Sequence, residues 1–365
     1  MKIECIKEKL SIALSKAEKI TNKNGTLPVL SCILLEVKNQ NLFIRSTNLD
    51  CAFEMEIPSK STVPGVVAVP GSIFSSFISS LKEKSVILET KENNLFIVTE
   101  HHQTTIKAFN HEDFPRTERI GEQNSFPISA KTLLKALKSV YYSASISSVK
   151  PELASVYIYG EGDFLYFVST DSFRLAEKKV KLKDAKNIKP MVVPVKNITD
   201  IIKVFDDSDD DINISCEKNQ VSFSTKSIYF VSRLVDAPFP DYKAIIPKNP
   251  TTEATMLKQD LVDTLKTLSI FSDKFNQTNI KIVPSEKKLT LTSKSNDIGE
   301  SSTLLDATVS GETIDMNFNH RYLSECLQSI DSDALSLSFS GTMKPLVVKG
   351  VSDSTFTYLV MPMNK

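Results

Sequence analysis

The stretch LSIALSKA, from Leu10 to Ala17, decides the fold because its pattern occurs three times in the chain. Leu10, Ala13, Leu14 and Ala17 stand at positions i, i+3, i+4 and i+7, which is the spacing of one apolar helix face. The spacing returns 123 positions later (133 minus 10) and again 128 positions further on (261 minus 133). These matches predict a unit of roughly 120 residues that the chain uses three times.

A second helix pattern supports the same register. It follows Pro70, with apolar residues at Phe74, Phe77, Ile78 and Leu81. The same spacing recurs over residues 198–205 and over residues 323–330. Each copy therefore contains two amphipathic helices, and apolar runs of strand character lie between and after them. The predicted class is α+β, with the two helices of each unit on one face of antiparallel sheets.

The length and composition agree with three soluble units. A chain of 365 residues, with 41% hydrophobic and 24% charged residues, predicts two or three domains, and the repeat selects three. Polar stretches without periodicity at 111–125 and 247–254 are the predicted linkers. We therefore expect domains at residues 1–121, 122–250 and 251–365.

Charge, cysteines and the N-terminus indicate a cytoplasmic protein without a membrane span. The formal net charge of +0 gives no general indication of nucleic-acid binding, although local patches can still set local fields. The N-terminal MKIECIKEKL has no apolar core of a signal peptide, and no apolar run approaches the roughly 20 residues that cross a bilayer. The scattered cysteines, which predict reduced thiols, are Cys5, Cys32, Cys51, Cys216 and Cys326.

The chain lacks the motifs of common enzymes, so we expect no catalytic site, no cofactor and no metal. G-x-S-x-G, P-loop and G-x-G-x-x-G patterns are missing from the sequence. His101 and His102, with His111 nearby, have no cysteine or carboxylate placed to complete a metal site, so a solvated hairpin is the preferred interpretation. The acidic run of residues 206–211 lacks the glycine and distal glutamate of a calcium loop, which favours a solvated turn.

Four segments at the ends of the units carry a resemblance to a known family. They are TDSFRLA (170–176), RLVDAPFPDYKAIIP (233–247), FNHRYLSECL (318–327) and the terminal YLVMPMNK (358–365). In this order and spacing, together with three tandem units, they resemble the bacterial sliding clamps, the beta subunits of DNA polymerase III. The resemblance covers essentially the whole chain.

The resemblance implies a head-to-tail homodimer that closes into a ring around duplex DNA. A head-to-tail contact whose rotation closes gives a finite ring, and pairing of strand edges between subunits removes exposed sheet edges. The implied partners are double-stranded DNA, bound without sequence preference, the alpha subunit of the replicative polymerase, the clamp loader and other proteins with clamp-binding motifs. The implied function is that of a non-catalytic processivity factor.

The resemblance also implies a hydrophobic pocket between units two and three that binds short peptides from these partners. Arg174 is expected to donate to peptide carbonyls, while Asn319 and Tyr322 would fix the peptide backbone. The apolar slot for a leucine or phenylalanine anchor is expected at Leu175, Ile245, Val360 and Met361. The full set of matching positions is Leu153, Thr170, Ser172, Phe173, Arg174, Leu175, Pro240, Ile245, Phe275, Asn319, Tyr322, Met343, Val360, Met361, Pro362 and Met363.

The chain departs from the family pattern at three places around this pocket. Ser172 and Phe173 stand where Gly-His is usual, Ala244 stands where a basic residue is common, and residues 364–365 replace an Arg-Leu-type ending. We therefore expect the pocket to prefer a more hydrophobic and less polar peptide.

Candidate DNA contacts follow from family positions and from one helix face. They are Lys23, Asn24, Lys150, Lys196 and Arg321. Lys9, Lys16 and Lys23 recur at seven-residue spacing on the polar face of the first helix, for which an ordinary solvated face is the alternative. Position 24 is often Arg in the family but is Asn here, so we expect modest affinity for phosphate groups. The protein would then stay on DNA because it encloses the duplex.

The expected subunit interface comprises Thr104, Ile106, Ser269 and Ile270, of which Thr104 and Ile106 in unit one and Ile270 in unit three match family positions. Ser269 stands where an aliphatic residue is common, which predicts a weaker dimer. The alternative function is that of a scaffold with the same fold that no longer closes into a ring. The neutral net charge and Ser269 are compatible with this alternative. A gel-filtration mass separates monomer from dimer, and a processivity assay separates scaffold from clamp.

Overall fold

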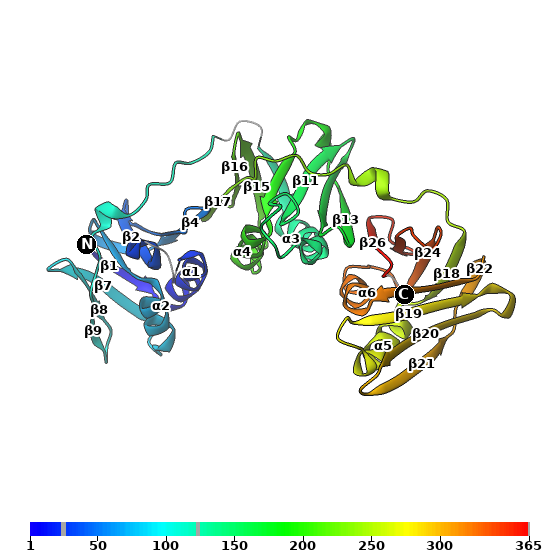
Figure 1. The fold of residues 1–365 in the computed structure, drawn as a ribbon. Helices are drawn as coiled ribbons and strands as arrows, with labels where there is room; N and C mark the ends of the chain where they lie inside the picture. The colour runs from blue at the N-terminus through cyan, green and yellow to red at the C-terminus, as the bar shows by residue number, and fades with distance from the viewer. Residues whose placement is uncertain (23–26, 122–124, 364–365) are drawn as a thin grey trace. The chain divides into compact units, whose positions relative to one another are not determined.

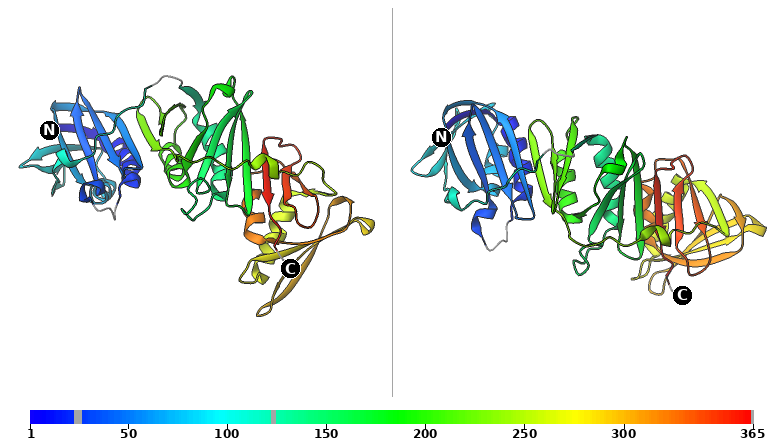
Figure 2. Two further views of the ribbon diagram at one scale, coloured as in Figure 1. Left: turned by 45° about the horizontal axis from the view of Figure 1, so that its top comes forward. Right: turned by 90° about the horizontal axis from the view of Figure 1, so that it is seen from above.

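The computed structural model describes residues 1–22, 27–121 and 125–363, and Figures 1 and 2 show its ribbon. It divides into two compact units, Met1–Lys131 with Lys196–Leu234, and Thr132–Val195 with Val235–Lys365. The middle third of the chain contributes to both units, because its strands join two different sheets.

The first unit contains two antiparallel sheets. One has five strands in the order β5-β1-β7-β8-β9, and the other has eight in the order β10-β15-β16-β17-β4-β3-β2-β6. The helices are α1 (Lys7–Ile20), α2 (Gly71–Ser80) and α4 (Val195–Phe205). The strands are β1 (Lys2–Ile6), β2 (Cys32–Lys38), β3 (Asn41–Thr47), β4 (Cys51–Pro58), β5 (Lys60–Val63), β6 (Gly65–Pro70), β7 (Ser85–Lys91), β8 (Asn94–Val98), β9 (Gln103–Ile106), β10 (Phe126–Ser129), β15 (Asp211–Glu217), β16 (Gln220–Ser224) and β17 (Ile228–Arg233).

The second unit repeats this plan. Its sheets run β14-β11-β12-β13-β26-β25-β24-β18-β22 and β21-β20-β19-β23. The helices are α3 (Ala130–Val140), α5 (Lys258–Leu268) and α6 (His320–Leu327). The strands are β11 (Ser155–Glu161), β12 (Phe164–Thr170), β13 (Arg174–Lys181), β14 (Met191–Pro194), β18 (Thr252–Leu257), β19 (Gln277–Val283), β20 (Lys288–Ser295), β21 (Gly299–Leu305), β22 (Thr308–Gly311), β23 (Ile314–Asn319), β24 (Ala334–Phe339), β25 (Leu346–Gly350) and β26 (Phe356–Val360).

The repeated helix face is the buried one, as predicted. Leu10, Ala13, Leu14 and Ala17 are each 0% exposed, and α1 contacts α2 and the strands β3 and β4. Figure 1 shows α1 and α2 side by side. Burial of one leucine side chain contributes about 1.5–3 kcal/mol, so the periodic face, not helix propensity, holds each helix on its sheet.

Two strand pairs join successive copies of the repeat into continuous sheets. In the first unit β4 pairs with β17, and Ala52 lies opposite Val231. In the second unit β13 pairs with β26, and Leu175 lies opposite Leu359; the two strands lie beside each other in Figure 2. We call these pairs the first junction and the second junction.

The described parts of both predicted linkers are held on neighbouring strands. In the first, Phe114 packs on the cluster around Leu34 and Ile120 packs on Ala52 and Val231. The second was predicted to extend to residue 254, but β18 already begins at Thr252. The physical reason is that a few apolar side chains in a polar stretch suffice to fix it on a sheet.

Lys16, which the spacing places with Lys9 and Lys23 on the polar face of the first helix, is not available to solvent or to DNA, so neither interpretation of that face holds for it. Lys16 is 7% exposed, and its ammonium group forms an ion pair with Asp207. Asp207 belongs to the acidic run, so this turn provides a carboxylate partner for α1. His101 and His102 lie in the exposed connection between β8 and β9, which confirms the predicted hairpin.

Candidate functional site

The turn between β12 and β13 forms the first part of the candidate site. The Thr170 hydroxyl donates to the Arg174 carbonyl at 2.6 Å and accepts from the Ser172 N–H at 3.1 Å. The Asp171 carboxylate accepts from the N–H groups of Phe173 and Arg174, both at 2.9 Å. These bonds hold Ser172 in the left-handed region at φ +77° and leave the Phe173 side chain 63% exposed.

Arg174 makes several contacts within the chain, and its expected role as a donor for peptide carbonyls stays a prediction. Its Nε donates to Asp171 at 3.0 Å, its Nη1 donates to Glu325, and its Nη2 donates to the Tyr142 carbonyl at 2.6 Å. The guanidinium also lies 4.3 Å from the Tyr322 ring centroid. Although burial lowers the pKa of Arg174, the Glu325 hydrogen bond raises it above its usual range.

Backbone hydrogen bonds attach the C-terminal segment to this turn. The Met361 N–H donates to the Phe173 carbonyl at 2.8 Å, and the Met363 N–H donates to the Asn317 carbonyl at 2.7 Å. Met361, Pro362 and Met363 are all partly exposed. The tail thus lies beside the backbone of Phe173 and has partly exposed apolar side chains.

Asn319 caps helix α6, so its carbonyl oxygen is occupied within the chain. That oxygen accepts from the N–H groups of Arg321 at 3.0 Å and Tyr322 at 3.3 Å, an N-cap arrangement. Its Nδ2 donates to the carbonyl of Phe275 at 3.5 Å. Asn319 therefore positions Tyr322 and Phe275, and its expected contact with a peptide backbone stays a prediction.

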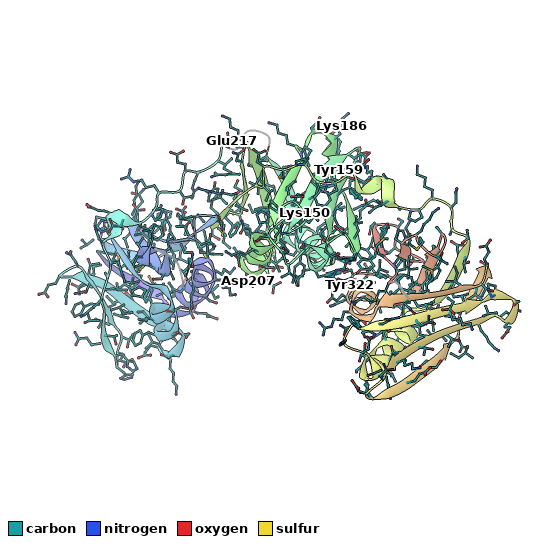
Figure 3. The ribbon with its side chains drawn as sticks, viewed as in Figure 1. Lys150, Tyr159, Lys186, Asp207, Glu217 and Tyr322 are labelled. Atoms are coloured by element: carbon teal, nitrogen blue, oxygen red, sulfur yellow. The ribbon has the colours of Figure 1, made fainter. Side chains whose placement is uncertain are left out.

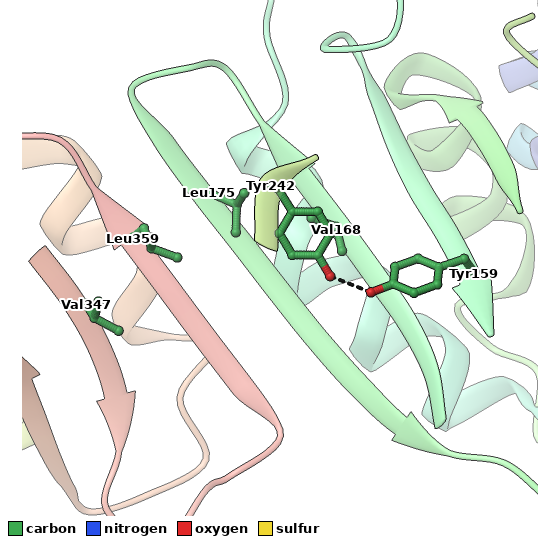
Figure 4. Packing of buried hydrophobic residues seen from close by; sticks show 6 residues of the cluster. All are labelled: Tyr159, Val168, Leu175, Tyr242, Val347 and Leu359. Atoms are coloured by element: carbon green, nitrogen blue, oxygen red, sulfur yellow. Dashed lines mark hydrogen bonds between the residues drawn. The ribbon is translucent and has the colours of Figure 1, made fainter. Parts of the chain in front are cut away.

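Leu359, and not Val360, shares the strand face of Leu175. Leu175 lies opposite Leu359 and Arg174 opposite Val360 across β13 and β26. Because side chains alternate across a strand, Leu359 shares the Leu175 face and Val360 points to the other face. Leu175 and Leu359 belong to one buried cluster with Tyr159, Val168, Tyr242 and Val347, drawn in Figure 4.

The segment that carries Pro240 and Ile245 is fastened to this cluster by Tyr242. The Tyr242 hydroxyl donates to Glu177 at 2.6 Å and lies 2.6 Å from the Tyr159 hydroxyl, the contact dashed in Figure 4. Burial and the hydrogen bond with Glu177 raise the pKa of Tyr242 well above its usual range. Pro240 and Ile245 are exposed on either side of this anchor.

The structure therefore assembles most of the expected peptide-site residues within the second unit. The 170–174 turn, the 361–363 tail, Tyr322 and Phe275 are joined by the contacts described above. Leu153 is buried, with its carbonyl accepting from the Ser145 N–H at 2.8 Å. Met343 is 78% exposed in the connection from β24 to β25, and no described contact joins it to the others.

Sequence reasoning missed Leu359, Tyr242 and Glu177. The sequence shows that Leu359 and Val360 are neighbours in a strand and so point to opposite faces. It does not show which of them faces Leu175, because that depends on the strand register. Tyr242 lies inside the FPDY segment, but nothing in the sequence shows that its hydroxyl meets Glu177, 65 positions away.

Three of the five candidate DNA contacts are described by the structure. Lys150, Lys196 and Arg321 are exposed, and Figure 3 labels Lys150, which lies on the connection before β11. Lys23 and Asn24 lie outside the described residues. No described contact places nucleic acid, so these positions remain predictions.

The expected interface residues lie at or near sheet edges. Thr104 and Ile106 belong to β9, the edge strand of its sheet, but Ile106 is 6% exposed because its side chain packs within its own subunit. Ile270 is 64% exposed beside Ser269, in a short helix that contacts the edge strand β21. Ile298 and Leu304, which the sequence did not single out, are exposed at this edge.

The described residues offer neither of two other kinds of site. They contain no group of three or more His, Cys, Asp and Glu side chains that could hold a metal ion. No helix among them is long and apolar enough to cross a bilayer.

Comparison with known protein families decides the relationship of the chain. Family models described as the N-terminal, central and C-terminal domains of the DNA polymerase III beta subunit match residues 1–118, 127–241 and 243–364. The chain belongs to the DNA polymerase III beta subunit family. Its role is therefore that of a sliding clamp, a processivity factor of DNA replication.

Relatives and solved structures agree with this family. The beta sliding clamp of Staphylococcus epidermidis is 27% identical over 359 residues, covering 96% of this chain and 95% of the relative. That of Staphylococcus aureus is 26% identical, with the same coverage. The DNA polymerase sliding clamp of Bacillus subtilis superposes with a TM-score of 0.95 at 23% identity, covering 100% of this chain and 99% of that one. For the Thermotoga maritima beta subunit the TM-score is 0.93 at 22% identity, with the same coverage.

Proposed function

We propose that the chain forms a head-to-tail homodimer that closes around duplex DNA and carries replication and repair proteins along it. The observation that carries this proposal is the match of all three thirds of the chain to successive domains of one clamp family. DNA would be held without sequence preference, because enclosure does not require contact with bases.

Sheet edges supply the subunit contact in this proposal. Strands β9 and β21 each pair on one side only, and exposed Ile270, Ile298 and Leu304 accompany β21. Pairing of β9 with β21 of a second copy would remove two exposed edges. It would also cover these apolar side chains, which a lone subunit leaves in water.

The peptide site is proposed to bind short extended segments of the polymerase alpha subunit, the clamp loader and other clamp-motif proteins. Phe173, Ile245, Phe275 and Met343 are more than half exposed in the second unit, and large exposed apolar side chains favour partner binding. With Phe173 in place of a polar ring, a hydrophobic peptide is the expected ligand. Methionines 361 and 363 add adaptable contacts suited to several partners.

The remaining assignments follow from the clamp role. We propose that the chain acts without a catalytic site of its own, in the cytoplasm, and with domains at 1–121, 122–250 and 251–365. Clamp loader and polymerase would bind the same peptide site in turn. Exchange between the two partners requires that each peptide dissociates readily, which is typical of micromolar dissociation constants.

Retention on DNA tests the ring. The protein is loaded with its clamp loader onto nicked circular DNA, washed in high salt and counted before and after the circle is cut. A ring stays on the circle and leaves the linear form, because enclosure resists salt whereas phosphate contacts do not. Loss from both forms in salt would instead support a scaffold that does not close.

Peptide affinity tests the second site. We expect a fluorescein-labelled pentapeptide with leucine and phenylalanine anchors to bind with micromolar affinity, and Phe173→Ala to weaken it about tenfold. Phe164→Ala removes another exposed ring of the same unit and should leave the affinity unchanged. Equal effects of the two substitutions would reject the proposed site.

A further inference from the structure

The first junction repeats the turn of the second junction. Residues 47–52 correspond to residues 170–175, which lie 123 positions later (170 minus 47). The Thr47 hydroxyl donates to the Cys51 carbonyl at 2.8 Å and accepts from the Leu49 N–H at 3.1 Å. Thr170 makes the same two bonds in its own turn, at 2.6 and 3.1 Å.

The other bonds of the turn also match. Asn48 Oδ1 accepts from the N–H groups of Asp50 at 3.0 Å and Cys51 at 2.9 Å, which is the role of Asp171. Leu49 has φ +76°, against +77° for Ser172. A non-glycine residue in this region is uncommon, so its occurrence at both corresponding positions shows that one backbone frame is built twice.

The neighbouring strand completes the frame in the same way. The Arg233 N–H donates to the Asp50 carbonyl at 2.9 Å, as the Met361 N–H does to the Phe173 carbonyl at 2.8 Å. Residues 231–233 therefore correspond to 359–361. The floor is smaller at the first junction, because Ala52 and Val231 replace leucines there.

Two adjoining hollows open on this frame within the first unit. The smaller encloses about 260 Å³ and is lined by residues 49–52, 115–118 and 231–233 together with Thr47 and Gln220. The larger encloses about 770 Å³ and shares Ala52 and residues 115–117 with it. The connecting segment is fixed by buried Phe114 and Ile120, so residues 115–119 bridge the space between these two anchors.

The rim of the smaller hollow is charged, whereas apolar side chains stand at two of the corresponding positions of the second junction. Asp50 and Arg233 stand at the positions of Phe173 and Met361, and Arg116 and Glu118 face them from the connecting segment. All four side chains are exposed, and none forms an ion pair with another residue in the described part of the chain. Charges of both signs around a small apolar floor favour a ligand that carries both signs.

We propose that the first junction is a second docking site, for an extended peptide with a small apolar anchor between a basic and an acidic residue. The proposal rests on the proposed function insofar as the second junction is taken as a peptide site. The repeated backbone frame supports an extended chain. Ala52 and Val231 line the smaller hollow but are covered in part by Ile120, so this floor admits a small anchor such as valine more readily than phenylalanine. The two junctions would thus select different partner segments on one subunit.

Fluorescence polarisation on the full-length protein tests this site. The probe is a fluorescein-labelled hexapeptide, Gly-Lys-Val-Glu-Ser-Gly. We expect saturable binding with a dissociation constant of about 0.1–1 mM. The double variant Arg116→Glu with Arg233→Glu should weaken it about fivefold to tenfold, because two attractive contacts become repulsive. Lys281→Glu, an exposed charge reversal in the second unit, should have no effect.

The two proposed sites fail separately in this experiment. Phe173→Ala should leave hexapeptide binding unchanged while it weakens the leucine-phenylalanine pentapeptide. No saturation of the hexapeptide signal up to about 5 mM, or an equal affinity of the double variant, would overturn the second docking site. Loss of hexapeptide binding in Phe173→Ala would show that both peptides use the second junction. An unchanged affinity of the Phe173→Ala variant for the pentapeptide would instead count against the proposed function.

Discussion

The Tyr242 hydroxyl donates a 2.6 Å hydrogen bond to the carboxylate of Glu177, and the two side chains are only 4% and 5% exposed. A buried carboxylate needs such a partner, because an unpaired one costs far more than the bond itself is worth. The bond fixes the segment that carries Pro240 and Ile245. Phe239 adds a second attachment through its stack on Tyr157, with ring centroids 4.8 Å apart.

Tyr242→Phe should therefore affect both stability and peptide binding. The substitution leaves Glu177 and the Tyr159 hydroxyl without their shared partner, which predicts a loss of about 1–3 kcal/mol in the free energy of unfolding. Urea unfolding measures this loss, and peptide titration should show weaker binding. Tyr141→Phe, which alters a partly exposed tyrosine, serves as the control. An unchanged unfolding curve for Tyr242→Phe would mean that water replaces the lost hydroxyl.

Ser172→Gly should stabilise the protein. Ser172 has φ +77°, a region that costs an L-residue roughly 1–2 kcal/mol and costs glycine almost nothing. Glycine gives back part of this gain through its more flexible unfolded chain, so we expect about 0.5–1 kcal/mol. Thermal unfolding should show a higher midpoint for Ser172→Gly and no increase for Ser172→Ala. A lower midpoint for the glycine variant would contradict the strain assigned to this turn.

Arg174→Lys should lower peptide affinity although the charge is kept. Lysine cannot reproduce the three directed hydrogen bonds to Asp171, Glu325 and the Tyr142 carbonyl, and it leaves these acceptors partly unsatisfied. We expect a stability loss of about 2–4 kcal/mol and a weaker peptide complex, because the 170–174 turn loses its brace. Calorimetric unfolding and peptide titration of one preparation measure both. Full affinity in a destabilised variant would limit Arg174 to a folding role.

Acid should weaken the protein through Asp353. Burial raises the pKa of Asp353, but hydrogen bonds from Thr355 and the nearby Lys178 more than offset this, so its pKa lies below the usual value. Because the pKa of this group is lower in the folded state, its ionisation stabilises the fold. The contribution is complete above the unfolded-state pKa of about 3.9 and is lost as the pH falls through the folded-state pKa. Asp353→Asn should therefore cost about 3–5 kcal/mol at pH 7, because Lys178 stays buried without its charge partner.

The difference between wild type and Asp353→Asn should shrink as the pH falls from about 5 to 2. Urea unfolding at several pH values measures it. A difference independent of pH would contradict a contribution from the charge of Asp353.

Ile270→Asp should shift the proposed dimer towards monomer. Ile270 is 64% exposed next to the edge strand β21, and a charge buried there would oppose association. Sedimentation velocity at micromolar concentration is the measurement, with at least a tenfold weaker dimer expected. Ile146→Asp, at a fully exposed isoleucine elsewhere, is the control. Equal dimer fractions for both variants would place the interface away from Ile270.

Much of the candidate site was predictable, but the roles of its residues were not. The segments around Ser172, Phe173 and Tyr322 are recognisable in the sequence, and the structure assembles them in one unit. The sequence suggested ligand contacts for Arg174 and Asn319, but it did not show that both also hold segments of the chain together. A side chain's partner depends on residues far away in sequence, which no local pattern shows.

The sequence by itself determined the threefold repeat, the two helices of each copy and the family. Those features depend on local periodicity, since the same apolar spacing must bury the same helix face each time it occurs. Only the tertiary structure decided that Leu359 and not Val360 faces Leu175, that Lys16 is buried against Asp207, and that the 47–52 turn duplicates the 170–175 turn. Each of these depends on strand register or on contacts between distant segments, because a shift of one residue would move every side chain to the opposite face.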